Sequence, residues 1–320
     1  MVPTNQSRYD VTLRPLAYTS ILALSLLASI LSSAPRCALA LPPASQAEDW
    51  PRTVLLTNDD GIDDPGLLAL ARAFAPVAET IVVAPLGDRS GSTHYVSVYS
   101  KHVLQVQERD LGAGIEAYAV DGYPGDCVLL ALQGLLADNP PDLVVAGING
   151  GPNLGFDWLA SGTIGAARLA TVWGVPAIAV SGLAADSPDA AAAVAEWVVG
   201  LARSELARGL RAGQYLTVSL PRTDPTEFKG VRVAERAGIL LDFRFSQVDA
   251  DTSGTRTALW AIQRPQPIAP DAGANDATLY QDGYVVIVPM LADEVDREAL
   301  AHLLEQPESL PEWPETERGE

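Results

Sequence analysis

One stretch of the sequence decides the fold: VLLTNDDGIDDPG, residues 54–66. It begins with the apolar run Val54 to Leu56, which is typical of a strand buried on both faces, and polar residues follow at once. Pro65 then opens an apolar periodic segment that predicts a helix ending near Phe74. A buried strand, a polar loop and a helix in this order predict the first unit of a parallel sheet covered by helices.

The same alternation of apolar strand-like runs and helical segments continues to about residue 220. The expected strands are Thr80–Ala84, Val103–Val106, Ala117–Val120, Leu143–Ala146, Ala177–Val180 and Tyr215–Val218, and the expected helices are 126–136, 162–173 and 189–208. Continuous apolar strands alternating with helices predict a doubly wound α/β domain with a mostly parallel sheet. We therefore place the core domain at residues 53–220.

The pattern changes after residue 220, where strand-like pieces around Val231 and Leu259 alternate with loops rich in Asp, Pro and Gly. We expect a β-rich extension and a C-terminal helix over residues 221–305. The acidic, proline-containing tail, residues 306–320, is expected to be mobile.

The N-terminus has the features of an export signal. Arg8 and Arg14 precede an apolar run from Leu16 to Leu31, and Ala38-Leu39-Ala40 supplies the small residues that signal peptidase needs. We expect cleavage after Ala40, a linker over residues 41–52, and a periplasmic or secreted mature chain. A retained membrane anchor is the competing interpretation, although hydroxyl residues interrupt a run already short for a membrane span.

The net charge argues against nucleic-acid polymers as partners. The formal charge is −19, and residues 1–40 carry three Arg and one Asp, so their removal lowers it to −21. No stretch gathers Lys or Arg into the kind of basic patch that follows a nucleic-acid backbone. Once the signal is removed we also expect no membrane association.

Only one of the two cysteines remains after cleavage, because Cys37 lies within the signal. An internal disulfide is therefore not expected in the mature chain. Cys127 stands in an apolar run, which favours a buried core residue over a catalytic thiol.

The chemistry is expected in polar loops, because ligands of open parallel sheets bind outside the carboxyl ends of the strands. Asp59 and Asp60 follow the first strand, and adjacent carboxylates repel unless a cation joins them. Oxygen ligands favour Mg²⁺ or Mn²⁺ over zinc. The alternative is a solvated turn that caps the next helix, an interpretation that we adopt for Asp63 and Asp64.

Three further loops carry unusual polar content: residues 88–94 with Ser90, Gly91 and His94, residues 147–155 with Asn149 and Asn153, and residues 161–163, Ser-Gly-Thr. Hydroxyl and amide oxygens can ligate a hard metal, and the free amides at a helix start can hold a phosphate. Each loop has a plainer alternative, namely a polar turn, a pair of left-handed turn positions or an ordinary N-cap. His94 fits a surface histidine as readily as an acid or base.

Taken together and in order, these loops resemble the SurE-type survival proteins, a family of metal-dependent 5′/3′-nucleotidases. The matching strings are TNDDG at 57–61 with Pro65-Gly66, VVAP at 82–85 with RSG at 89–91, DCV at 126–128 after Pro124, GIN at 147–149 with GPNLG at 151–155, SGT at 161–163, and GVPAIAVS at 174–181. The resemblance covers residues 53–220 well and the remainder loosely. It implies a Rossmann-like core and a C-terminal region that takes part in forming a homodimer or homotetramer.

The resemblance also implies the site residues. The family's ligands for one divalent metal, Mg²⁺ or Mn²⁺, fall on Asp59, Asp60, Ser90 and Asn149. Its phosphate contacts fall on Asn153, Ser161, Gly162 and Thr163, and we add Gly91 because the amides of its loop can cradle a phosphate. Typical members are cytoplasmic, which is the alternative to export.

The chain departs from the family pattern at the rim of this site. Asp63-Asp64 precede Pro65-Gly66 where many members have His-Ala, the acidic residue usual in the helix after Ser-Gly-Thr is missing around Arg168, and His94 replaces a common Asn. We expect these changes to affect substrate preference more than the class of reaction.

The sequence thus predicts metal-dependent hydrolysis of nucleoside monophosphates, with Asp59 and Asp60 as catalytic residues. Either Asp60 orients or deprotonates the attacking water, or Asp59 forms a transient phospho-aspartate. The alternatives are an exported, non-catalytic binder of nucleotides or phosphate esters and a broad acid-phosphatase-like enzyme. A haloacid-dehalogenase-type phosphatase needs Asp-x-Asp after the first strand, and dinucleotide-dependent redox chemistry needs Gly-x-Gly-x-x-Gly at the same place. The chain has neither motif after its first strand.

Overall fold

The computed structural model describes residues 50–182, 187–248 and 259–305. The predicted signal peptide, residues 41–49 of the predicted linker and the predicted acidic tail lie outside the described residues. Among the described residues, no helix has the length and apolar character needed to cross a membrane.

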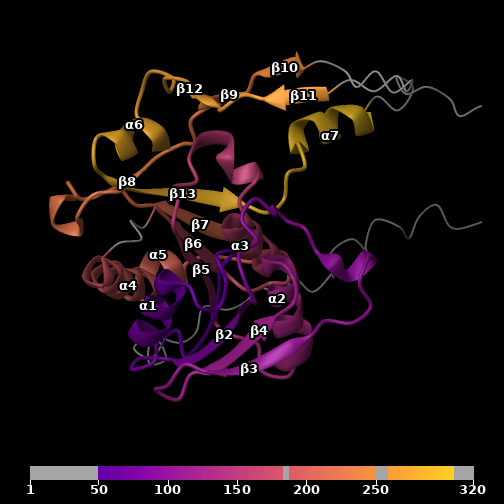
Figure 1. The fold of residues 1–320 in the computed structure, drawn as a ribbon, viewed down its shortest axis with the longest axis vertical. Coiled ribbons are helices and arrows are strands. Elements are labelled where there is room, and N and C mark those ends of the chain that lie inside the picture. Colours follow the sequence, from indigo (N-terminus) through magenta and orange to yellow (C-terminus); the bar gives the residue numbers. More distant parts are fainter. Residues whose placement is uncertain (1–49, 183–186, 249–258, 306–320) are drawn as a thin grey trace, which may run out of the picture. The chain divides into compact units, whose positions relative to one another are not determined.

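Strands and helices alternate through the first two thirds of the described chain (Figure 1). The strands are β1 Thr53–Thr57, β2 Glu79–Pro85, β3 Val106–Asp110, β4 Glu116–Val120, β5 Leu143–Asn149, β6 Ala177–Ser181, β7 Gln214–Ser219, β8 Val231–Val233, β9 Leu241–Asp242, β10 Phe245–Val248, β11 Leu259–Ile262, β12 Gln266–Pro267 and β13 Val285–Leu291. The helices are α1 Pro65–Phe74, α2 Pro124–Leu130, α3 Gly162–Val172, α4 Pro188–Ala202, α5 Glu205–Arg208, α6 Asp276–Gln281 and α7 Arg297–Glu305.

The main sheet confirms the predicted α/β class. Its strand order is β3-β4-β2-β1-β5-β6-β7-β13-β8. Strands β4, β2, β1, β5, β6 and β7 run parallel to one another, whereas β3 pairs antiparallel with β4 and β13 antiparallel with β7. Neighbouring strands on both sides of β1 therefore end at the same edge of the sheet, and this edge carries the polar loops.

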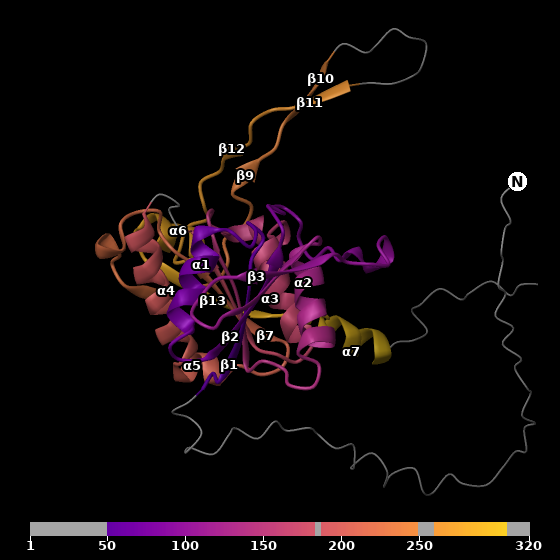
Figure 2. The same ribbon diagram turned by 60° about the horizontal axis from the view of Figure 1, so that its bottom comes forward.

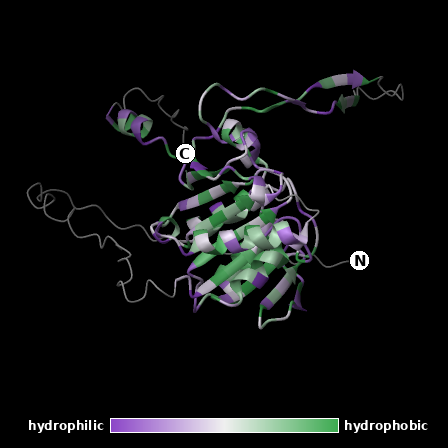
Figure 3. Cartoon of the chain, turned by 90° about the vertical axis from the view of Figure 1, so that its left-hand side faces the viewer, coloured by the Kyte–Doolittle hydropathy of each residue, from purple (hydrophilic) through white to green (hydrophobic). Residues whose placement is uncertain are grey.

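Helices cover both faces of this sheet because its strands are apolar on both sides. Val54 and Leu56 of β1 join one buried cluster with residues of α1 and α4, while Leu55 between them joins a second cluster with residues of α2 and α3. Figure 3 shows that hydrophobic residues fill the strands and that hydrophilic residues gather on the outer surfaces. This two-sided burial is what keeps the strand ends, and hence the loops that follow them, in place.

Two predicted elements differ in detail. The strand expected at residues 103–106 lies at Val106–Asp110, where it pairs with β4 through an edge position that tolerates its charged residues. The helix expected at residues 189–208 is broken, because Ser204 leaves the helical path and its hydroxyl caps the start of α5.

The C-terminal region contributes strands to the main sheet and also forms separate β-ladders. β13 and β8 extend the sheet beyond β7, so the core continues past residue 220. Beyond β8 the chain forms two short antiparallel ladders, β9 with β12 and β10 with β11, along the same pair of chain segments (Figure 2). We call residues 239–248 and 259–268 the arm.

Candidate functional site

The structure brings the four polar loops together at the carboxyl ends of β1, β2 and β5. The amide of Arg89, in the second loop, donates to the carbonyl oxygen of Asp59 at 2.7 Å. Gly150, in the third loop, lies with its amide nitrogen 3.4 Å from a carboxylate oxygen of Asp60. The hydroxyl of Thr163, at the start of α3, donates to the carboxylate of Asp59 at 2.5 Å. The first loop is therefore in contact with each of the other three.

Asp59 lies beneath the start of α3 and is only 3% exposed. Burial raises the pKa of its carboxyl group, while the Thr163 hydroxyl and the amides of Gly162 and Thr163 stabilise the charged form and oppose that rise. The positive end of the α3 helix dipole also stabilises the charged form of Asp59. Asp59 is thus a buried carboxylate that the helix start holds in one orientation.

Asp60 has less protein support for its charge. Burial, the neighbouring charge of Asp59 and then that of Asp64 raise the pKa of Asp60 to about 7. No Lys or Arg among the described residues forms an ion pair with Asp59 or Asp60. A pair of carboxylates in this condition fits a site for a cation.

Ser90 and Asn149, the other two predicted ligands, stand next in sequence to Arg89 and Gly150, whose backbone amides contact Asp59 and Asp60. The Ser90 hydroxyl donates to Asp88 at 2.6 Å, which leaves its oxygen lone pairs as acceptors. The side-chain amide of Asn149 donates to the carbonyl of Gly151 at 2.6 Å, and this bond directs its nitrogen toward the backbone. Among the described residues no group of three or more His, Cys, Asp or Glu side chains is arranged to hold a metal.

A β-bulge positions Asn149. The pairing of β5 with β6 shifts in register between Ala146 and Asn149, and Gly147 within the bulge has φ = 135°. A Cβ atom at Gly147 would lie 2.4 Å from the carbonyl oxygen of Val180, so only glycine fits there. Gly147 is therefore required by the close approach of β6.

The predicted phosphate residues line the start of α3 and the neighbouring loops. The Ser161 hydroxyl accepts from the Ile164 amide at 3.1 Å and is the N-cap of α3. The Asn153 side chain donates to the Ser181 hydroxyl at 2.7 Å, and Gly91 is exposed in the second loop. Gly162 packs against Asp59, because a Cβ atom there would lie 2.8 Å from its carboxylate. The roles of these residues in phosphate binding stay predictions.

Three residues outside the predicted ligand set have clear structural roles. Asp64 accepts from the amides of Gly66 and Leu67 and caps α1, as expected. Cys127 is fully buried, which confirms it as a core residue, and burial raises the pKa of its thiol. His94 packs edge-on against Trp158, and burial followed by the charge of Arg168 lowers the pKa of its imidazole.

Sequence reasoning missed two residues that hold site side chains. Asp88 fixes the orientation of Ser90, and Ser181 fixes that of Asn153. Ser181 had a detectable signal, since it is the polar residue that ends an apolar core strand at the same sheet edge. Asp88 had none beyond its place in a polar loop.

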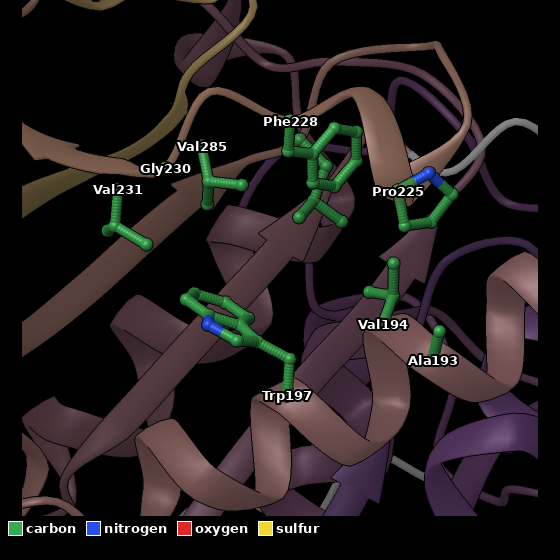
Figure 4. Close-up of a pocket in the computed structure, with 9 residues that line it drawn as sticks. Ala193, Val194, Trp197, Pro225, Phe228, Gly230, Val231 and Val285 are labelled. Atoms are coloured by element: carbon green, nitrogen blue, oxygen red, sulfur yellow. The ribbon is translucent and has the colours of Figure 1, made fainter.

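An apolar cavity of about 280 Å³ lies apart from these loops, between α4 and strands β8 and β13. Figure 4 shows Trp197 of α4 across the cavity from Phe228 and Val285. None of its nine lining residues has a titratable side chain, so the cavity lacks the groups that a hydrolytic reaction needs.

Comparison with known proteins was made on sequence and on structure. The family model described as survival protein SurE matches residues 54–239. A protein named 5′-nucleotidase SurE from Desulfitobacterium hafniense is 35% identical over 244 residues, which is 76% of this chain and 92% of that protein. One of the same name from Geobacter sulfurreducens is 36% identical over 250 residues, 78% of this chain and 92% of that protein.

A solved structure gives the same result. The crystal structure of the SurE protein from Aquifex aeolicus aligns with a TM-score of 0.64 at 29% identity, covering 80% of this chain and 99% of that one. The chain therefore belongs to the SurE family of survival proteins.

Proposed function

We propose that this protein is a nucleotidase that hydrolyses nucleoside monophosphates to nucleoside and phosphate. The observation that carries the proposal is the contact of Asp59 with the start of α3, which places the adjacent carboxylates of Asp59 and Asp60 beside a helix N-terminus. Such a pairing suits a phosphate ester bound together with a divalent cation. The relatives named 5′-nucleotidase support the same reaction.

We further propose that Asp59, Asp60, Ser90 and Asn149 hold one divalent cation, Mg²⁺ or Mn²⁺. The donor set is made only of oxygens, and burial together with the charges of Asp59 and Asp64 raises the pKa of Asp60, so a cation would relieve the repulsion there. When bound, the cation would offset charge on the phosphoryl oxygens.

The protein's own residues bind the substrate and direct water. The start of α3, with Ser161, Gly162 and Thr163, takes the phosphate together with Asn153 and the backbone of Gly91. Asp60, at the carboxyl end of β1 and within reach of the Gly150 amide, orients the attacking water and accepts its proton. Water is favoured over Asp59 as the nucleophile, because Asp59 is buried and already accepts the Thr163 hydroxyl.

The site fits a small-molecule substrate, and we propose that the active protein is a homodimer or homotetramer assembled through the arm. Phe245, Trp260 and Ile262 of the arm are 56%, 59% and 69% exposed. A two-stranded ladder with apolar side chains in water is marginally stable by itself, so a partner surface would stabilise it. Export after cleavage at Ala40 remains our proposal for localisation.

The test is phosphate release by the purified mature chain from a panel of 5′- and 3′-nucleoside monophosphates, with Mn²⁺, with Mg²⁺ and with chelator. We expect release that needs the metal and differs between substrates. A folded protein that binds nucleotide but releases no phosphate would instead be a non-catalytic binder, and equal activity on unrelated phosphate esters would indicate a broad phosphatase.

The variants D59N and D60N test the assignment of the two aspartates. Each should lower turnover by about two orders of magnitude or more while the protein stays folded, because each removes a carboxylate of the proposed cation site. D138N is the matched control, since Asp138 is exposed and precedes β5, at the opposite edge of the sheet from these loops, and should leave turnover near wild type. Near-normal turnover in both D59N and D60N would contradict the assignment.

A further inference from the structure

A buried ion pair from the C-terminal region holds the loop that carries Asn153. Arg236 follows β8, and its side chain is only 12% exposed. Its guanidinium donates to the backbone carbonyls of Asn153 at 3.2 Å and Gly155 at 3.3 Å, and to the Thr217 hydroxyl at 2.9 Å. One side chain thus binds two carbonyls of the proposed phosphate loop and anchors them to β7.

Asp276, the first residue of α6, completes this arrangement. Its side chain is 1% exposed and lies 3.6 Å from the Arg236 guanidinium. One carboxylate oxygen accepts the amide of Gly155 at 2.9 Å, and the other accepts the amide of Ala237 at 2.7 Å. The ion pair therefore binds both backbone groups of Gly155: Arg236 binds its carbonyl and Asp276 binds its amide.

The loop is also pressed against the segment that follows Arg236. Gly155 has φ = 51°, and a Cβ atom there would lie 2.4 Å from the carbonyl oxygen of Gly238. The Phe156 amide donates to the same carbonyl at 3.4 Å. The loop after Asn153 therefore has little freedom to move relative to residues 236–238.

Stability alone is a weak reason for such a pair, because burying two charges costs about as much free energy as their attraction returns. What the pair does here is specific: its hydrogen bonds go to backbone groups of Asn153 and Gly155, while Ser181 holds the Asn153 side chain. We propose that Arg236 and Asp276 are positioning residues that set the placement of Asn153 at the phosphate site. This inference rests on the proposed role of Asn153.

The experiment compares R236K and D276N with wild type. Lysine at position 236 keeps the charge but cannot donate to three acceptors in the fork geometry of arginine. Asparagine at position 276 replaces one of the two acceptor oxygens by an NH₂ donor, which would face a backbone amide. With the Mn²⁺-loaded protein we would measure the affinity for inorganic phosphate by calorimetry and, for the best nucleotide, KM and kcat.

Both variants should weaken phosphate binding and raise KM by roughly tenfold or more, with a smaller effect on kcat. The reason is that a displaced Asn153 weakens binding of the phosphate in the ground state and in the transition state alike. Mn²⁺ affinity should stay unchanged, because the pair contacts none of the proposed metal ligands. R232K is the matched control: Arg232 lies in β8, four residues before Arg236, but its guanidinium donates to the Val231 carbonyl and lies over the Tyr284 ring. Its phosphate affinity should match wild type.

A double-mutant cycle separates positioning from general destabilisation. If Arg236 acts through Asn153, the effect of R236K on phosphate affinity should largely disappear in an N153A background. Additive effects of R236K and N153A on phosphate affinity would overturn the proposal, and so would wild-type phosphate affinity in a folded R236K. If D276N does not fold, R236K alone decides. Absence of nucleotide hydrolysis in wild type would refute the proposed function, whereas phosphate binding would still test the role of Arg236.

Discussion

At the scale of single residues, Asp59 and Asp60 are neighbours in sequence with different surroundings. Asp59 is covered by α3 and receives a hydroxyl and helix amides, whereas the environment of Asp60 raises the pKa of its carboxyl group to about 7. Hydrogen bonds from the start of α3 therefore stabilise the charge of Asp59, whereas burial and the neighbouring carboxylates disfavour the charge of Asp60.

This difference predicts a pH dependence of stability in the metal-free protein. The pKa of Asp60 is higher in the folded than in the unfolded chain, so the folded state binds more protons between about pH 4 and pH 7. The contribution of Asp60 to stability is therefore fully present below this window and is lost as pH rises through it. Melting curves with chelator at pH 5 and pH 8 measure the loss.

D60N is the comparison that isolates this residue, because its side chain does not titrate. The fall in melting temperature from pH 5 to pH 8 should be smaller in D60N than in wild type. Adding Mn²⁺ at pH 8 should stabilise wild type more than D60N. An identical pH dependence in the two proteins would show that the Asp60 carboxyl group is not perturbed.

At the scale of elements, the start of α3 is the structural centre of the site. Ser161 caps the helix, Thr163 donates to Asp59, and Gly162 between them lies against Asp59 and Ser92. A Cβ atom at Gly162 would lie 2.7 Å from the Ser92 hydroxyl and 2.8 Å from the Asp59 carboxylate. Helix start and catalytic loop therefore fit together only when this residue has no side chain.

We expect G162A to lower turnover by at least about tenfold, because the added methyl group displaces Asp59 or the helix start. The matched control is G200A in α4, where a Cβ atom meets nothing within 4 Å. That change should stabilise the protein by roughly 0.5–1 kcal/mol through helix propensity and leave turnover unchanged. Steady-state kinetics and urea unfolding of both variants provide the test; normal turnover in G162A would contradict the close contact.

At the scale of the whole molecule, the arm exposes large apolar side chains on both of its strands. Every residue of β11 is exposed, and β10 is mostly exposed. Phe245 stands opposite Ile262 in the ladder, so large apolar side chains occur on both strands. This surface suits burial against another copy of the chain.

Assembly through the arm predicts that the double variant W260D/I262D is smaller in solution than wild type. Sedimentation velocity of the mature chain should show a dimer or tetramer for wild type and a shift toward monomer for the variant, because buried charge opposes association. V77D, a change at a 41% exposed valine outside the arm, should leave the assembly intact. A wild-type monomer at micromolar concentration would refute assembly.

Much of this fold was determined by local sequence pattern. The helix Pro65–Phe74 and the strands on either side of it follow from apolar runs, a proline at the first helical position and the capping aspartate Asp64. Because parallel strands end at one edge of the sheet, the sequence also indicated which loops carry the chemistry.

Tertiary structure alone decided which groups meet. The Thr163 hydroxyl reaches Asp59 across 104 residues of chain, and Asp276 reaches Gly155 across 121. Neither contact has a signature in local periodicity, because hydrophobic pattern and turn chemistry report only on neighbours in sequence. The sequence by itself determined the elements and the polar strand ends, and folding determined the partners of each carboxylate, since those depend on burial and on segments distant in the chain.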